Sequence, residues 1–229
     1  SLLPEESPEV GGYDIAGFSE SCDETGGDYY DFYPLPNNQT GLVVGDVSGH
    51  GIGAALLMTT ARAFMKALSK EMSDLPSMLG HLNDLLEEDM EDEKFMTLLF
   101  GIVDPDKNEF IYSSCGHDEP QHFHATDNSF TEMDSTGMPL GIMPGMDFPT
   151  AEPIPLQSGD IIFICTDGIW EAPNEAQEQY GKERLRDVLT QNKDQSAINI
   201  IKAVEKSVKD FIGNYERKDD LTMIVVKRD

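Results

Sequence analysis

The chain has 229 residues, of which 39% are hydrophobic and 26% are charged, and its formal net charge at pH 7 is −27. This length is typical of one domain with a substantial buried core. The strong negative charge argues against binding to nucleic acid or to an anionic membrane surface. It is compatible with the collection of divalent cations, although a solvated acidic surface accounts for most of the 43 acidic residues.

The sequence shows neither a membrane span nor a signal peptide, because it has no run of about 18 apolar residues and no basic-then-apolar N-terminus. Its three cysteines, Cys22, Cys115 and Cys165, are scattered without C-x-x-C spacing. Such a set is typical of a reducing compartment and argues against a zinc site. We therefore expect a cytoplasmic location.

A hairpin is predicted after a first strand over residues 13–18. One strand of the hairpin opens with a carboxylate at Asp28, and the other is an apolar run that ends at Asp46. The turn residues Pro36-Asn37-Asn38 stand between them. Folding about Asn37 sets residue 28 opposite residue 46 to within a residue or two, so that two aspartates come to one sheet edge.

A glycine-rich turn follows, with glycine at four of the nine positions from 45 to 53. A turn with so few Cβ atoms lets the backbone approach a ligand closely. Apolar residues at positions 57, 61, 64, 68 and 72 then keep a helical period, which predicts a helix from about Gly53 to Met72. An aspartate at a strand end directly before a helix is well placed to hold a metal ion.

A second helix is predicted next, with Asp74 as its cap and Pro76 in its first turn. It runs out in an acidic stretch over residues 87–93, most simply a solvated helix end or loop. Strands are expected over residues 95–103 and 109–115, joined by a turn.

A weaker strand is predicted from Gln121 to Ala125, with His122 and His124 on one face. A pair of histidines without a third ligand is more often ordinary surface. Residues 134–159 are rich in Gly, Pro and Met and are interpreted as a long loop with short strand fragments, a candidate lid or substrate-contacting rim.

The last third of the chain contributes two more aspartates at strand ends. An apolar run ends at Asp167-Gly168, and Asp219-Asp220 stands just before the final apolar strand. If these two strands are antiparallel, both aspartates lie at the same sheet edge. An irregular segment is expected from Trp170, and a final helix over residues 197–211 stops at Gly213.

Four separated segments thus each deliver an aspartate to what we expect to be one edge: Asp28, Asp46, Asp167 and Asp219. A lone aspartate beside a turn is usually a cap or a turn former. The four together, in this order, favour a metal site, because Mg²⁺ and Mn²⁺ prefer oxygen ligands in near-octahedral geometry.

The motifs around these residues resemble those of a known family. They are Gly26-Gly27-Asp28-Tyr29-Tyr30-Asp31-Phe32, Gly45-Asp46-Val47-Ser48-Gly49-His50-Gly51, Thr166-Asp167-Gly168 and Asp219-Asp220-Leu221-Thr222. Their order is similar to that in the SpoIIE/RsbU-type branch of the metal-dependent serine/threonine protein phosphatases (type 2C, PPM superfamily), and the resemblance covers nearly the whole chain.

The resemblance implies an α+β fold, a four-layer α-β-β-α sandwich with mostly antiparallel sheets, and two Mn²⁺ or Mg²⁺ ions. It implies that Asp46 bridges the ions and that the Val47 carbonyl binds one of them. Asp167 and Asp219 would hold the second ion, and Asp28 would support the first. The loop at Cys115-Gly116-His117-Asp118-Glu119-Pro120 departs from the family pattern at Asp118 and Glu119, which puts a substrate role of that loop in doubt.

Three assignments stay open. Asp220 competes with Asp219, although the motif alignment favours Asp219. His50 is either the general acid for the leaving serine oxygen or a residue that orders the glycine-rich turn, with equal weight on each. Asp31 is disfavoured, since alternation along the strand points it to the face opposite Asp28.

The implied function is hydrolysis of phosphoserine or phosphothreonine on a bacterial regulatory protein of the anti-sigma-factor-antagonist (STAS) type. The abrupt start at Ser1-Leu2-Leu3-Pro4 resembles the end of a helical linker, so we expect residues 1–229 to be one phosphatase domain excised from a longer chain with an upstream sensor. A second copy of the chain is a further candidate partner.

Three rival functions were weighed. Gly49-His50-Gly51-Ile52-Gly53-Ala54 fits a dinucleotide fingerprint, but the helix after it leads to another helix rather than to a parallel strand. A two-metal nuclease would use similar acids, but the chain has no basic stripe. A catalytically weak partner-switching module of the same fold is the third rival.

Overall fold

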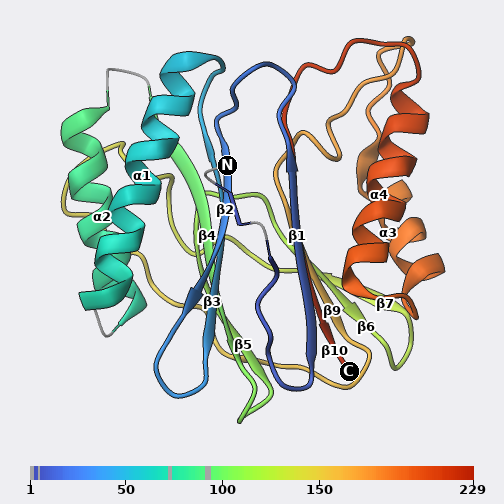
Figure 1. The fold of residues 1–229 in the computed structure, drawn as a ribbon, viewed down its shortest axis with the longest axis horizontal. Helices are drawn as coiled ribbons and strands as arrows, with labels where there is room; N and C mark the ends of the chain where they lie inside the picture. The colour runs from blue at the N-terminus through green and yellow to red at the C-terminus, as the bar shows by residue number, and fades with distance from the viewer. Residues whose placement is uncertain (1–2, 5, 72–73, 91–93) are drawn as a thin grey trace.

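The computed structural model describes residues 3–4, 6–71, 74–90 and 94–229. Two antiparallel sheets pack face to face, with a helical pair on each outer side (Figure 1). One sheet contains β2 (Asp28–Pro34), β3 (Thr40–Val47), β4 (Met96–Asp104), β5 (Glu109–Cys115) and β8 (Ile154–Pro155), in that spatial order. The other contains β1 (Tyr13–Glu20), β10 (Leu221–Arg228), β9 (Ile161–Cys165), β6 (Gln121–His124) and β7 (Ser129–Glu132).

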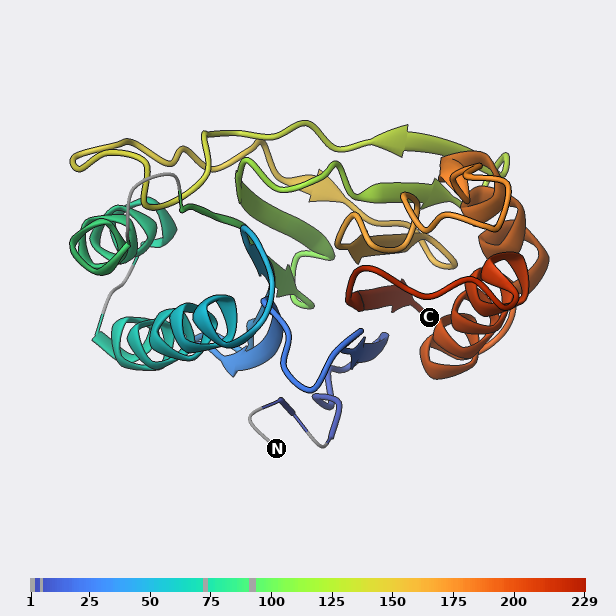
Figure 2. The ribbon, with the colours of Figure 1, turned by 90° about the horizontal axis from the view of Figure 1, so that it is seen from above.

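The helices complete the outer layers, so the predicted α-β-β-α sandwich is confirmed. Seen from above, one helical pair flanks each side of the two sheets (Figure 2). The pair beside the β2–β3–β4 sheet is α1 (Ile52–Glu71) and α2 (Leu75–Asp89), and the pair beside the other sheet is α3 (Gly181–Asn192) and α4 (Ala197–Ile212). Each layer boundary is a hydrophobic cluster: one under α1 and α2, one between the sheets, and one under α3 and α4.

The β2–β3 hairpin has the predicted register. Asp28 pairs with Asp46, and the ladder runs without a bulge to Pro34 and Thr40. The turn depends on Asn37 and Asn38, which adopt left-handed φ angles of 58° and 60°. Asparagine tolerates this conformation better than most residues, which is why these two residues predicted the turn correctly.

The last strand is antiparallel to the strand that precedes Asp167, as predicted. Met223 on β10 pairs with Cys165 on β9, and the Thr166 amide donates to the Thr222 carbonyl at 3.1 Å. The end of β9 and the start of β10 therefore lie at the same sheet edge.

The predicted helices are confirmed to within a residue or two. α1 ends at Glu71, and Met72 and the acidic residues 91–93 lie outside the described residues. The Asp74 carboxylate caps α2 by accepting from the Ser77 amide at 2.9 Å. Helix α4 ends at Gly213, which has a positive φ of 64°. Helix α3 was not predicted from the sequence.

The long loop before β8 contains short bridges, as predicted, but it runs beside α2. The Gly141 amide donates to the Asn83 side-chain oxygen at 3.0 Å, and the Asn83 amide group donates to the Met143 carbonyl at 2.9 Å. Asn83 is fully buried and thus fastens the loop to the helix.

The connections around β3 rule out the dinucleotide fingerprint. β3 pairs antiparallel with both β2 and β4, and α1 leads into α2. A dinucleotide fold instead requires a second parallel strand after the helix. Among the described residues, no helix has the length and apolar character that a membrane span requires.

Candidate functional site

A cleft of about 400 Å³ opens where β3 and β9 end and β10 begins. Three of the predicted aspartates, Asp46, Asp167 and Asp219, face it from three different elements. The remaining lining residues are Ser48, Gly49, His50, Phe95, Thr97, Gly116, His117, Asp118, Thr166 and Lys218.

The fourth predicted aspartate, Asp28, lies behind the cleft wall and is buried, with 5% of its surface exposed. The Thr166 hydroxyl donates to Asp28 Oδ2 at 2.8 Å, which links β2 to the end of β9 across the two sheets. Burial, followed by the charge of Asp46, raises the pKa of Asp28 well above its usual value.

The carboxylates of the cleft raise one another's pKa values. Burial, and then the charges of Asp167 and Asp219, raise the pKa of Asp46 to about 7. The pKa values of Asp167 and Asp219 are also raised, in both cases mainly by burial. Like charges held together in a partly buried cleft are unfavourable unless a cation or protons neutralise them.

Asp219 and Asp220 have different environments. Asp219 is exposed and lines the cleft. Asp220 is buried, and its carboxylate accepts from the amides of Cys22 at 2.8 Å and Asp28 at 3.4 Å. Asp220 therefore ties the start of β10 to the β1–β2 connection, and Asp219 is the one of the two that faces the cleft.

The glycines of the aspartate motifs permit this close packing. A Cβ atom at Gly26 would lie 1.9 Å from Asp220 Oδ2, and one at Gly168 would lie 2.0 Å from the Asp220 carbonyl oxygen. A Cβ at Gly27 would lie 2.8 Å from the Val47 carbonyl oxygen, the predicted metal ligand. The motifs thus need glycine because the backbones around the aspartates nearly touch.

The structure places His50 at the cleft and Asp31 away from it. His50 is exposed on the glycine-rich turn and lines the cleft. Asp31 points away, as predicted, and forms ion pairs with Arg62 at 3.3 Å and Lys66 at 3.4 Å on α1. It therefore anchors α1 to β2 and takes no part in the cleft.

Three residues from the loop after β5, Gly116, His117 and Asp118, also line the cleft, although the sequence did not predict a role for them there. Burial, and then the charge of Asp167, raises the pKa of Asp118 to about 6. His117 is buried, its Nδ1 lies 3.2 Å from the Thr97 hydroxyl, and burial lowers its pKa to about 4. The aspartate at position 118, where the sequence departs from the family motif, thus adds a carboxylate to the cleft.

The predicted lid is not part of the cleft wall: none of the lining residues comes from the loop over residues 134–159. The loop lies against the wall at Gly116, where a Cβ would be 2.5 Å from the Pro139 ring. The loop is fastened to α2 through Asn83, and its contact with a substrate stays a prediction.

The donor set suits a hard divalent cation. Carboxylate oxygens reach the cleft from β3, from the end of β9 and from the start of β10, with no cysteine among the lining residues. Such oxygen donors are the ligands that Mg²⁺ and Mn²⁺ prefer. Burial and the charges of Asp167 and Asp219 raise the pKa of Asp46, so a cation bound between these carboxylates would relieve an unfavourable arrangement.

Comparison with known proteins shows the family to which the chain belongs. The family profile of Stage II sporulation protein E (SpoIIE) matches residues 36–229, which include the β3, β9 and β10 aspartates. The chain belongs to the SpoIIE family. The SpoIIE-family chain is 27% identical over 228 residues to the phosphoserine phosphatase RsbU of Bacillus subtilis, covering all of this chain and 67% of RsbU.

Solved structures agree with this assignment. The RsbU and RsbW domains of Rv1364c from Mycobacterium tuberculosis superpose with a TM-score of 0.80 at 27% identity, over 96% of this chain and 61% of that one. RsbX in complex with magnesium superposes with a TM-score of 0.69 at 18% identity, over 97% of this chain and 98% of RsbX, which shows the shared fold. The SpoIIE-family chain therefore spans only part of the length of RsbU and of Rv1364c.

Proposed function

We propose that this SpoIIE-family chain is a metal-dependent protein phosphatase that hydrolyses phosphoserine or phosphothreonine. The observation that carries the proposal is the convergence of Asp46, Asp167 and Asp219 on one cleft, with Asp28 directly behind it. The similarity to RsbU, a phosphoserine phosphatase, supports the same reaction.

We propose that the cleft would hold two Mn²⁺ or Mg²⁺ ions, and that Asp46 would be a ligand of both. The Val47 carbonyl and Asp28 would serve the first ion, and Asp167 and Asp219 the second. When bound, such ions would supply positive charge beside the phosphoryl group and a water of lowered pKa. The magnesium complex of RsbX supports this choice of metal.

Other residues of the cleft would position the substrate. Lys218 is the one lysine or arginine that lines it among the described residues, and it is exposed. In a chain with a charge of −27, this ammonium group is a good contact for a phosphate oxygen. His50 at the rim would protonate the leaving oxygen or order the turn, and its substitution by glutamine distinguishes these roles through the pH profile of kcat.

The substrate is proposed to be a phosphorylated regulatory protein of the STAS type, controlled through segments outside this chain. The similarity to RsbU and to the RsbU domain of Rv1364c supports a partner-switching system. Asp46 and Val47 lie directly before α1, so a shift of this helix under the influence of an upstream sensor, or of a second copy of the chain, would change metal affinity.

The direct test is hydrolysis of p-nitrophenyl phosphate and of a phosphoserine peptide with Mn²⁺, Mg²⁺ or a chelator. We expect turnover only with metal, loss of turnover in Asp46→Asn and Asp167→Asn, and normal turnover in Asp194→Asn, which alters an exposed acid outside the cleft. Hydrolysis in ¹⁸O-labelled water should place the label in the released phosphate. A trapped phosphoenzyme would contradict direct water attack.

A catalytically weak binding module is the alternative function. It predicts binding of a phosphorylated STAS protein without metal-dependent turnover. The complete set of cleft aspartates favours the enzyme. The same assay separates the two, since the binding module would leave both substrates intact at every metal concentration.

A further inference from the structure

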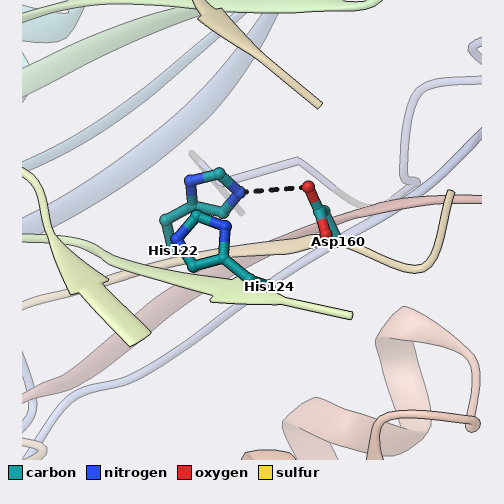
Figure 3. A group of neighbouring side chains, drawn as sticks. All are labelled: His122, His124 and Asp160. Atoms are coloured by element: carbon teal, nitrogen blue, oxygen red, sulfur yellow. Dashed lines mark hydrogen bonds and ion pairs between the residues drawn. The ribbon is translucent and has the colours of Figure 1, made fainter. Parts of the chain in front are cut away.

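A second group of metal-ligating side chains lies away from the cleft. His122 and His124 on β6 and Asp160 just before β9 place one ligand atom each within 4.8 Å of the others. Figure 3 shows the two imidazole rings beside each other with the Asp160 carboxylate facing them. We propose that His122, His124 and Asp160 form a binding site for a divalent transition-metal ion, with Zn²⁺ as its preferred occupant.

Strand β6 places both histidines on the same face of its sheet. Residues 122 and 124 share one face of β6 because side chains alternate along a strand. The other face is occupied: Gln121 accepts from Arg186 Nε on α3 at 2.9 Å, and Phe123 packs in the cluster under α3 and α4. Both histidines therefore point away from the helices.

Asp160 is held rigidly in a ligating position. Its carboxylate accepts from the amides of Ala125 at 2.8 Å and Gln157 at 2.9 Å, and it lies 3.3 Å from His122 Nε2. Asp160 is 2% exposed and His122 is 4% exposed, so these two side chains are almost inaccessible to water. A carboxylate that is itself hydrogen-bonded and a partly desolvated site are typical surroundings of a protein metal site.

The position of the His124 ring beside that of His122 is the feature that the His122–Asp160 hydrogen bond does not explain. The contact between His122 and Asp160 is an ordinary hydrogen bond that needs no metal ion. The ring of His124, however, lies only 4.0 Å from that of His122, an arrangement that becomes repulsive when both are protonated. A metal ion attracts both neutral imidazoles, and it therefore accounts for all three residues.

The surroundings of the rings support ligation. His122 is buried, and the neutral form of imidazole is the one that binds a metal ion. The Thr131 hydroxyl lies 2.8 Å from His124 Nε2. It would orient the His124 ring while Nδ1 binds the metal, as outer partners of metal-bound histidines commonly do.

The donor set selects a different metal from that of the cleft. Two imidazoles and one carboxylate suit Zn²⁺, with water as a fourth ligand, whereas the cleft offers mainly oxygen donors. Asp160 precedes β9 and Asp167 follows it, so the two sites lie at opposite ends of the strand, roughly 20 Å apart. The absence of paired cysteines argued against zinc, but histidines and a carboxylate supply the ligands instead.

The test uses the Asp46→Asn/Asp167→Asn double variant, which removes two of the four carboxylates that line the cleft and so weakens the competing site. Zn²⁺ is titrated by calorimetry, and Co²⁺ is titrated as a coloured probe of nitrogen ligation. We expect one ion per chain and a higher melting temperature with Zn²⁺. Adding His124→Gln should weaken binding by ~100-fold or more, and adding Thr131→Val by ~10-fold.

The matched control is His81→Gln, which alters an exposed histidine on α2 that contacts the Ser77 carbonyl. This change should leave the affinity for Zn²⁺ unaltered. His124 is only partly buried, so its variant is expected to fold, and circular dichroism without metal verifies this. Unaltered Zn²⁺ affinity in the folded His124→Gln variant, or no Zn²⁺ binding in the double variant, would overturn the proposal. Neither result bears on the phosphatase, which is assayed separately with Mg²⁺.

Discussion

Asp28 on β2 and Asp46 on β3 are register partners at the end of one hairpin. Like charges directly opposite each other weaken a sheet, and here burial strengthens the effect, since the pKa values of both carboxyl groups are raised. The protein thus keeps an arrangement that is unfavourable without a cation.

Replacement of Asp46 by asparagine should stabilise the metal-free protein while abolishing activity. The amide removes a charge that is disfavoured first by burial and then by the charges of Asp167 and Asp219. Because a pKa of about 7 lies about three units above the ordinary value, the gain near pH 8 is at most about 4 kcal/mol. Thermal unfolding in chelator measures it, with the exposed Asp194→Asn as control. A clear loss of stability would instead identify Asp46 as a structural cap.

The stability gap between Asp46→Asn and the wild type should close as the pH falls from about 7 to about 4. The folded-state pKa of Asp46 is raised, so the folded protein holds a proton that the unfolded chain releases in this range. The wild type therefore loses stability as pH rises through this window, and the variant loses less. Urea unfolding at several pH values tests this. A gap that is constant with pH would contradict the assignment.

Mg²⁺ should stabilise the wild type, because it neutralises the repulsion between the cleft carboxylates. At 100 times its dissociation constant, the ion should add about 2.7 kcal/mol to the free energy of unfolding. The Asp46→Asn/Asp167→Asn variant should gain almost nothing, since the shared ligand is gone. Differential scanning calorimetry with and without Mg²⁺ makes the comparison. Equal stabilisation of both proteins would place the ion elsewhere.

Gly168→Ala should destabilise the protein by at least about 2 kcal/mol and abolish activity. The new Cβ would lie 2.0 Å from the Asp220 carbonyl oxygen, a backbone atom that moves only with β10 and Asp219. Gly53→Ala in α1 is the matched control, because no atom lies within 4 Å of its Cβ. It should be neutral or stabilising by up to about 1 kcal/mol. Similar chevron plots for both variants would refute the steric argument.

Arg62→Met should destabilise the protein by about 1–3 kcal/mol. It leaves the Asp31 carboxylate, whose side chain is 7% exposed, with only Lys66 as an ion-pair partner. The effect is smaller than for a fully buried pair because Lys66 remains. Lys70→Met, an exposed change on the same helix, should stay within about 0.5 kcal/mol. Denaturant unfolding of both variants decides whether the anchor stabilises the fold.

The sequence alone determined the strands, their aspartates and much of the topology, because these follow from local chemistry. Alternation places Asp28 and Asp31 on opposite faces, and turn residues at Asn37 and Asn38 bring residue 28 opposite residue 46. The order of the motifs then predicted Asp167 and Asp219 as further residues of the site. Helix α3 was missed because its sequence is strongly polar and buries only two residues, Leu185 and Leu189.

Contacts between distant segments were decided only by the tertiary structure. The Asp219–Asp220 pair is distinguished by amides of Cys22 and Asp28, almost 200 residues away. The histidine pair on β6 gains its third neighbour, Asp160, 38 residues beyond His122. Asp118 joins the cleft because its loop folds beside the end of β9. No local pattern encodes such meetings, since they depend on how two sheets pack and not on the residues beside each group.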